Sequence, residues 1–145
     1  MGYLDSGYIA KFYLDEPDSG SVRRQAEALG QVYCAALGRV EVATALHRKL
    51  REGGLSERAF REVIAQFDDD CANELWTWIS VTPRILDAVV AVVRVVPRSV
   101  FVRGADAIHL GCARESGFTE VYTGDRRMTA AAPHFRLTAI TVRPG

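Results

Sequence analysis

The sequence contains few cysteines and almost no lysine. Cys34, Cys71 and Cys112 lie far apart and form no CxxC pair. This argues against a disulfide framework or a zinc site and fits a reducing compartment. Lys11 and Lys49 are the only lysines. The planar arginine guanidinium suits phosphate, but a compositional bias of the genome would give the same arginine excess, and we favour that explanation.

Long apolar runs are also missing. The most apolar stretch, residues 85–96, is interrupted by Asp87 and Arg94 and is shorter than the roughly 20 residues that span a membrane. It predicts a buried helix instead. The N-terminus has no basic region and Asp5 breaks its apolar run, so no signal peptide is expected. We therefore expect a cytoplasmic protein without a membrane partner.

Phosphate-binding and nucleophile motifs are absent as well, since the sequence has no GxxxxGK, GxGxxG or GxSxG. The formal net charge is +0, so no bulk charge attracts nucleic acid, although basic residues can still gather locally. Hydrophobic residues make up 48% of the 145 positions, which is ordinary for a soluble globular protein. The length predicts a single domain over residues 1–145.

Apolar stretches of strand length alternate with helical patterns along the chain. Strands are predicted at 2–5, 32–35, 76–81, 120–125 and 137–142, and helices at 6–14, 21–29, 37–51, 56–75, 84–96, 104–117 and 126–132. This alternation predicts an α/β fold in which a parallel sheet is covered by helices on both faces. All strands then end at one edge of the sheet, where such folds bind ligands.

Two aspartates follow predicted strands. Asp5 ends the stretch YLD, and Asp125 ends the stretch YTGD. A predicted helix comes directly after each, so each residue is either a helix N-cap or part of a functional site, and the local sequence does not decide between them. If the two strands are neighbours, both carboxylates lie at the same edge of the sheet.

Asp106 and Glu41 lie inside predicted helices. Asp106 sits among the small and apolar residues of RGADAIHLGCA, where an unpaired charge is costly. It either stabilises the first helical turn, paired with Arg103, or acts in a site, and we favour the site. Glu41 lies beside Arg48 and is interpreted from the pattern alone as facing solvent. The apolar face that it borders is predicted to comprise Val40, Ala43, Leu46 and Leu50.

Other polar residues carry weaker signals. The consecutive aspartates 68–70 point about 100° apart on a helix and lack a calcium-loop pattern, so they predict a solvated face. His109 is three residues from Asp106, but neither an HExxH motif nor a second nearby histidine supports zinc, and a hydrogen-bonded structural histidine is favoured. The remaining candidates are carboxylates, which favour a hard divalent cation.

Four stretches carry a combined signature: YLDSGYIAKFYLDEP, RVEVATALHR, RGADAIHLGCA and VYTGDRRM. In this order they resemble the PIN domain family, and closely the VapC-type ribonuclease toxins of VapBC toxin–antitoxin systems. The resemblance spans almost the whole chain, although residues 55–98 contribute little to it. It implies a three-layer α/β/α sandwich around a central, mostly parallel sheet.

The resemblance also implies a site and an activity. It carries the acidic residues of the family onto Asp5, Glu41, Asp106 and Asp125, which would hold Mg²⁺ or Mn²⁺, and a hydroxyl onto Thr123. Asp5 and Asp106 are the expected main ligands, with Glu41 and Asp125 as ligands or orienting groups. The implied activity is metal-dependent endoribonuclease cleavage of RNA phosphodiester bonds by the toxin of a type II toxin–antitoxin system.

Polar and basic residues near the four acids, and the binding partners of the chain, are also expected from the resemblance. Ser6 and Thr123 are expected to hydrogen-bond to the acidic cluster, and Arg103 and Arg126 to hold RNA phosphates at its rim. The implied partners are the RNA substrate, a small VapB-type antitoxin and a second copy of the chain in a homodimer.

Two alternatives remain beside this reading. Gly7 stands where the family usually has Ser or Asn, which keeps open a PIN-like module that binds RNA or protein without cleaving. A phosphatase or phosphotransferase with Asp5 as nucleophile would resemble enzymes that need a DxD motif. The chain has Asp5-Ser6-Gly7 at that place, so we disfavour this alternative.

Overall fold

The centre of the computed structural model, which describes residues 1–145, is a sheet of five parallel strands in the order β3-β2-β1-β4-β5. The strands are β1 (Gly2–Leu4), β2 (Val32–Ala35), β3 (Trp76–Ile79), β4 (Glu120–Tyr122) and β5 (Thr138–Ile140). The chain starts in the middle, adds β2 and β3 on one side, and then adds β4 and β5 on the other. The point where the strand order reverses therefore lies between β1 and β4, and ligands of parallel sheets bind at such points.

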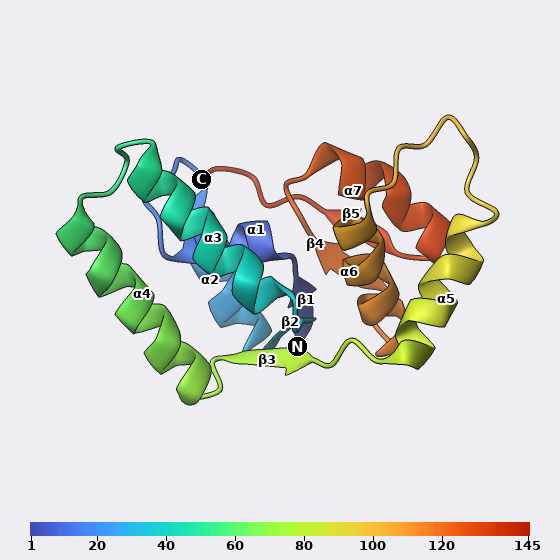
Figure 1. Ribbon diagram of the computed structural model, residues 1–145, viewed down its shortest axis with the longest axis horizontal. Coiled ribbons are helices and arrows are strands. Elements are labelled where there is room, and N and C mark those ends of the chain that lie inside the picture. The colour runs from blue at the N-terminus through green and yellow to red at the C-terminus, as the bar shows by residue number, and fades with distance from the viewer.

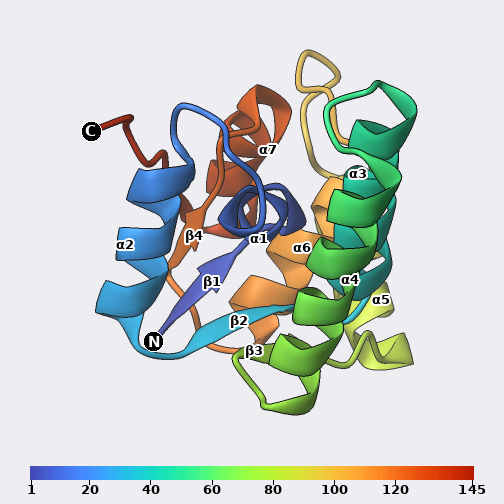
Figure 2. The same ribbon diagram turned by 90° about the vertical axis from the view of Figure 1, so that its left-hand side faces the viewer.

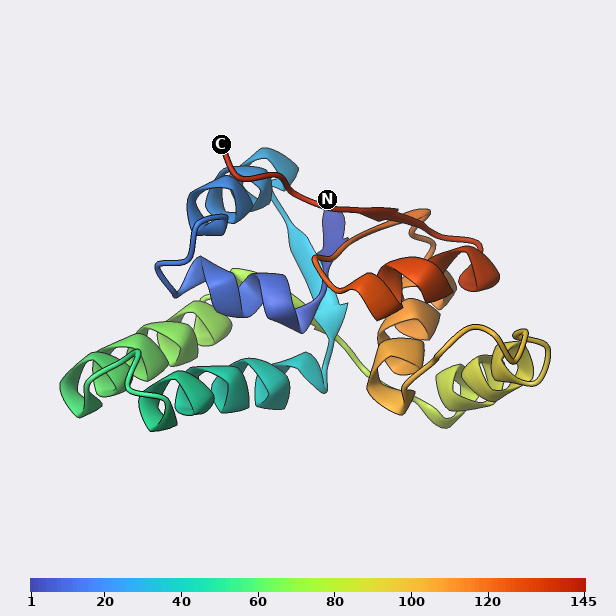
Figure 3. The same cartoon turned by 90° about the horizontal axis from the view of Figure 1, so that it is seen from above.

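Helices cover both faces of the sheet, as Figures 1 and 3 show. On one face lie α1 (Ser6–Phe12), α2 (Ser19–Leu29), α3 (Gly38–Arg51) and α4 (Glu57–Ala72). On the other lie α5 (Pro83–Val93), α6 (Gly104–Glu115), α7 (Arg126–Ala131) and the 3₁₀ turn η1 (Ala132–Phe135). The predicted α/β/α sandwich is confirmed, and its sheet is wholly parallel.

Two apolar cores hold these layers together, one on each face of the sheet. Tyr3 and Leu4 of β1 point to opposite faces because strand side chains alternate, and each is fully buried in a different core. The core under α5–α7 contains Leu110 and Phe135, whereas the core under α1–α4 contains Trp76. A strand buried on both sides is typical of a parallel sheet with helices on both faces.

Two packing predictions were wrong. Helix α5 is not buried: Ile85 and Val89 face the core, whereas Leu86 and Val90 are 40% and 48% exposed. Helix α3 buries Val42 and Leu46, whereas Val40 is 67% exposed. In both helices the apolar residues cover more of the circumference than the neighbouring helices cover, so composition alone overstates burial. No helix is both long enough and apolar enough to cross a membrane.

Four of the five strands were predicted to end one to three residues too late at the edge where the ligand would bind. The predicted strand 120–125 stops at Tyr122, and the first strand stops at Leu4. The residues that follow leave the regular sheet and turn into helices, and Figure 2 shows β1 leading directly into α1. These residues supply the candidate site.

Candidate functional site

The register of the sheet places Asp5 beside Thr123. Leu4 of β1 pairs with Tyr122 of β4, so the next residues of both strands are neighbours. The backbone N–H of Asp5 donates to the carbonyl of Tyr122 at 3.0 Å, and the Thr123 hydroxyl donates to Asp5 Oδ2 at 2.5 Å. The strands of Asp5 and Asp125 are neighbours, and both residues lie at one edge of the sheet, as predicted for this case.

Asp5 is both a helix cap and a buried acid. Its Oδ1 accepts a hydrogen bond from the backbone N–H of Tyr8 at 2.9 Å, which caps α1. Burial raises the pKa of the Asp5 carboxyl above its ordinary value, while the hydrogen bonds from Thr123 and Tyr8 act in the opposite direction. Nearby Asp125 raises this pKa further. The site therefore holds a carboxylate whose charge is costly without a cation.

Arg103 joins two of the other acids. Its Nε donates to Asp106 Oδ2 at 2.9 Å, and its Nη2 donates to Asp125 Oδ2 at 3.0 Å. Asp106 lies in the first turn of α6, and Asp125 caps α7 by accepting from the N–H groups of Arg127 and Met128. The pairing of Arg103 with Asp106, which the sequence offered as the alternative to a role in a site, is present. These carboxylates hold the pKa of Arg103 above its usual value, chiefly through the hydrogen bond to Asp106.

Glu41 is held at the site by a hydrogen bond to His109, a contact that the sequence pattern did not reveal. His109 Nε2 lies 2.5 Å from Glu41 Oε1, and His109 Nδ1 lies 2.6 Å from the Tyr3 hydroxyl. The Tyr3 hydroxyl also accepts from the backbone N–H of Ala35 at 2.9 Å. A carboxylate oxygen only accepts hydrogen bonds, so the Nε2–H of His109 donates to Glu41. Burial raises the pKa of Tyr3 well above its usual value, so its hydroxyl keeps its proton.

All four acids line one cavity of about 310 Å³, called the acidic cavity here. Its other lining residues include Ser6, Gly7, Lys11, Arg103 and His109. The acids come from the start of α1, α3, α6 and α7, where helix N-termini favour negative charge. Ser6 lines the cavity, but its hydroxyl forms no hydrogen bond with the acids, and Arg126 does not line it.

The donor chemistry of the acidic cavity fits a hard divalent cation, because carboxylate oxygens are the ligands that Mg²⁺ and Mn²⁺ prefer. Their present side-chain positions do not complete such a site: no group of three or more His, Cys, Asp or Glu side chains converges closely enough to hold an ion. Arg103 lies between Asp106 and Asp125, where it neutralises both. A cation shared by these two acids would therefore require this guanidinium to move.

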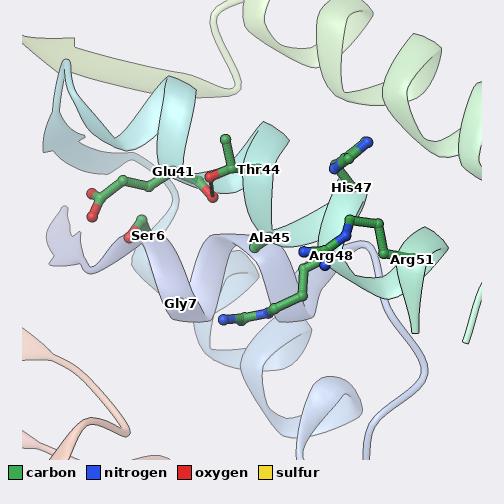
Figure 4. Close-up of a pocket in the computed structure, with 8 residues that line it drawn as sticks. All are labelled: Ser6, Gly7, Glu41, Thr44, Ala45, His47, Arg48 and Arg51. Atoms are coloured by element: carbon green, nitrogen blue, oxygen red, sulfur yellow. Dashed lines mark hydrogen bonds between the residues drawn. The ribbon is translucent and has the colours of Figure 1, made fainter.

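A second cavity of about 510 Å³ adjoins the acidic cavity and shares Ser6, Gly7 and Glu41 with it. We call it the basic cavity. The residues that complete its lining come from α3: Thr44, Ala45, His47, Arg48 and Arg51 (Figure 4). Glu41 and Arg48 thus line the same cavity, as the helical spacing predicts, although Glu41 is hydrogen-bonded rather than simply solvated.

Comparison with known proteins agrees with this geometry. The family model for the PIN domain matches residues 2–132. The chain is 31% identical to a protein named Ribonuclease VapC46 from Mycobacterium tuberculosis, over 140 residues that cover 95% of each protein. The match includes the strand ends and helix starts that bring the four acids together. This chain therefore belongs to the PIN domain family, with a VapC ribonuclease among its relatives.

Proposed function

We propose that the whole chain, residues 1–145, acts as one PIN domain with metal-dependent endoribonuclease activity, the toxin of a type II toxin–antitoxin system. The observation that carries the proposal is the convergence of Asp5, Glu41, Asp106 and Asp125 on one cavity at the edge of the parallel sheet. The similarity to a VapC ribonuclease over 95% of both chains supports RNA as the substrate.

The four acids would hold Mg²⁺ or Mn²⁺, with Asp5 and Asp106 as the main ligands. When bound, such an ion lowers the pKa of a coordinated water and stabilises charge on the leaving oxygen. Thr123 and the N–H of Tyr8 orient the two oxygens of Asp5, and His109 fixes Glu41. These contacts hold the acids in place before substrate arrives, which is what precise ligand geometry requires.

Arg103 has a separate role in this proposal. Its side chain is 43% exposed and is anchored only through Asp106 and Asp125. Release from these acids would leave its guanidinium at the rim of the acidic cavity, where it would bind an RNA phosphate by charge-assisted hydrogen bonds. The same residue would then serve as the resident counterion in the free protein and as a substrate contact in the complex.

The proposed partners follow from the same relationship. We infer that the chain cleaves RNA, is bound by a small VapB-type antitoxin, and forms a homodimer. Support for the antitoxin comes from the VapC name of the relative. Support for a dimer comes from Leu86, Val90 and Val93, which leave an apolar stripe exposed on α5.

Cleavage of structured RNA in Mn²⁺ or Mg²⁺ tests the function. We expect chelator to abolish cleavage and Asp106→Asn to reduce its rate by at least about 100-fold, because replacing even an outer contact of a metal site costs about 10–100-fold. Asp69→Asn is the matched control, since Asp69 is exposed on α4 and forms no side-chain hydrogen bond or ion pair. Unchanged cleavage by Asp106→Asn would contradict the mechanism.

Calorimetry with Mn²⁺ separates this function from the alternative module that binds RNA or protein without cleaving. The engagement of Asp106 and Asp125 by Arg103 is the observation that favours such a module. We expect Mn²⁺ to bind the wild-type protein and to bind Asp106→Asn more weakly. If the wild-type protein neither binds Mn²⁺ at neutral pH nor cleaves RNA, the chain is the module that binds RNA or protein without cleaving.

A further inference from the structure

We propose that the basic cavity is a subsite for the backbone phosphates of single-stranded RNA, formed by Arg48 and Arg51. The inference rests on the proposed ribonuclease function, because it places the phosphates next to the one at the acidic cavity. Neither arginine lies at the carboxylates, so the subsite would contribute to binding and leave the reacting groups unchanged.

The first support is the stripe that α3 presents to both cavities. Glu41, Thr44, Arg48 and Arg51 are spaced by three, four and three residues, and such spacing places them on one face of a helix. At about 1.5 Å of rise per residue the stripe is about 15 Å long. It leads from a carboxylate of the acidic cavity to two arginines, which fits an extended polyanion better than one small anion.

The second support is that both arginines are available. Neither Arg48 nor Arg51 takes part in an ion pair or a side-chain hydrogen bond, whereas Lys49 between them pairs with Glu16 at 3.0 Å. In Figure 4 the side chain of Arg48 extends from α3 toward Gly7, and that of Arg51 extends back toward Arg48. Helical side chains lean toward the N-terminus of their helix, which here is the direction of the acidic cavity.

The third support is the open connection at Gly7. Both cavities are lined by Gly7, which has no side chain to separate them. A Cβ placed there would lie 3.5 Å from Asp5 Oδ1, so any larger side chain would occupy the junction. The glycine that departs from the usual family residue thus leaves a path along which an RNA backbone can run from Asp5 to Arg48.

RNA is favoured over an acidic peptide as the occupant. Guanidinium groups bind phosphate through paired hydrogen bonds, and RNA carries a phosphate at every nucleotide, which matches two arginines on one stripe. An alternative role for Arg48 and Arg51 is to stabilise the C-terminal turn of α3 by charge. That role requires neither the cavity nor a ligand, so binding measurements distinguish it from the subsite.

The experiment measures binding of a short fluorescein-labelled single-stranded RNA by anisotropy, in chelator so that no cleavage occurs. We expect Arg48→Gln/Arg51→Gln to bind about tenfold more weakly at about 0.1 M salt, with a salt slope smaller by about 1.4, since each phosphate contact contributes about 0.7 for a single strand. Arg84→Gln/Arg94→Gln removes the same charge from exposed, unpaired arginines at α5 and should bind like the wild type.

Cleavage assays in Mn²⁺ should then show a raised KM and an unchanged kcat for Arg48→Gln/Arg51→Gln. RNA binding equal to wild type, or a loss as large in the α5 control, would overturn the subsite. So would a poly-glutamate peptide that binds wild type more tightly than RNA and loses affinity in the double variant. Failure of the wild type to cleave RNA would overturn the ribonuclease function instead, because the binding assay needs no catalysis.

Discussion

At the scale of single residues, Asp5 combines two roles that favour different chemistry. Capping of α1 needs only an oxygen that accepts from Tyr8, and asparagine caps helices as well as aspartate does. The charge of Asp5 is buried beside Asp125, and burial raises the pKa of its carboxyl. The charge therefore costs stability in the free protein, which indicates that it is kept for the function of the site.

Replacement of this charge should make the protein more stable and inactive. We expect Asp5→Asn to raise the Tm at pH 7, by about 2–4 °C for each 1 kcal/mol relieved in a chain of this size. Because the folded-state pKa is raised, ionisation penalises the folded state only above the ordinary aspartate pKa of about 3.9. The gain in Tm of the variant over the wild type should therefore be absent below about pH 3.9 and should grow with pH up to the raised pKa. Thermal melts from pH 3 to pH 7 measure this, and an equal or lower Tm of Asp5→Asn at pH 7 would contradict it.

The sequence predicted which acids meet, but not what holds them. Asp5 and Asp125 follow strands, and the rule that parallel strands end at one edge was enough to bring them together. Glu41 and Asp106 joined them only through the family resemblance, since both lie inside helices and the rule for strand ends does not apply to them. The contact of Arg103 with Asp125, 22 residues away, depends on how far the loops project, which no periodicity encodes.

At the scale of elements, a chain of hydrogen bonds ties four of them together behind the site. It runs from Ala35 of β2 through Tyr3 of β1 and His109 of α6 to Glu41 of α3. The sequence predicted a structural histidine, and this is confirmed, but its partners lie 68 and 106 residues away. Such partners are set by how α3 and α6 pack across the sheet edge, so local patterns could not identify them.

Removal of one hydroxyl should weaken this connection. Tyr3→Phe leaves the buried N–H of Ala35 without a partner, and leaves Nδ1 of His109 with only the weak contact of the Cys34 thiol at 3.9 Å. An unsatisfied buried polar group costs about 1–3 kcal/mol, so we expect the free energy of unfolding in urea to fall by about 2 kcal/mol. Tyr33→Phe is the control, because the Tyr33 hydroxyl forms no hydrogen bond and Tyr33 also packs against the core. Equal stability of the two variants would show that the chain of hydrogen bonds contributes nothing.

At the scale of the whole molecule, α5 is the helix whose composition and burial disagree most. Its interior is almost wholly apolar, yet it lies at the outside of the sandwich and packs mainly on α6 (Figure 1). Leu86, Val90 and Val93 recur at intervals of four and three residues and are 40–48% exposed, so they form one stripe. A second copy of the chain would bury this stripe and account for a helix too apolar for its position.

The oligomeric state in solution tests whether the apolar stripe of α5 is a dimer interface. A stable interface buries about 800 Å² on each partner, which needs more than one stripe, and Val95, just after α5, is a further exposed apolar residue. We expect light scattering to give twice the mass of one chain for the wild type and a single-chain mass for Val90→Glu, with unchanged circular dichroism, because a charge at the centre of the stripe would be buried unpaired. Val40→Glu, at an even more exposed valine on α3, should remain a dimer. A monomeric wild type, or a Val90→Glu variant that still dimerises, would leave the apolar face of α5 without this explanation.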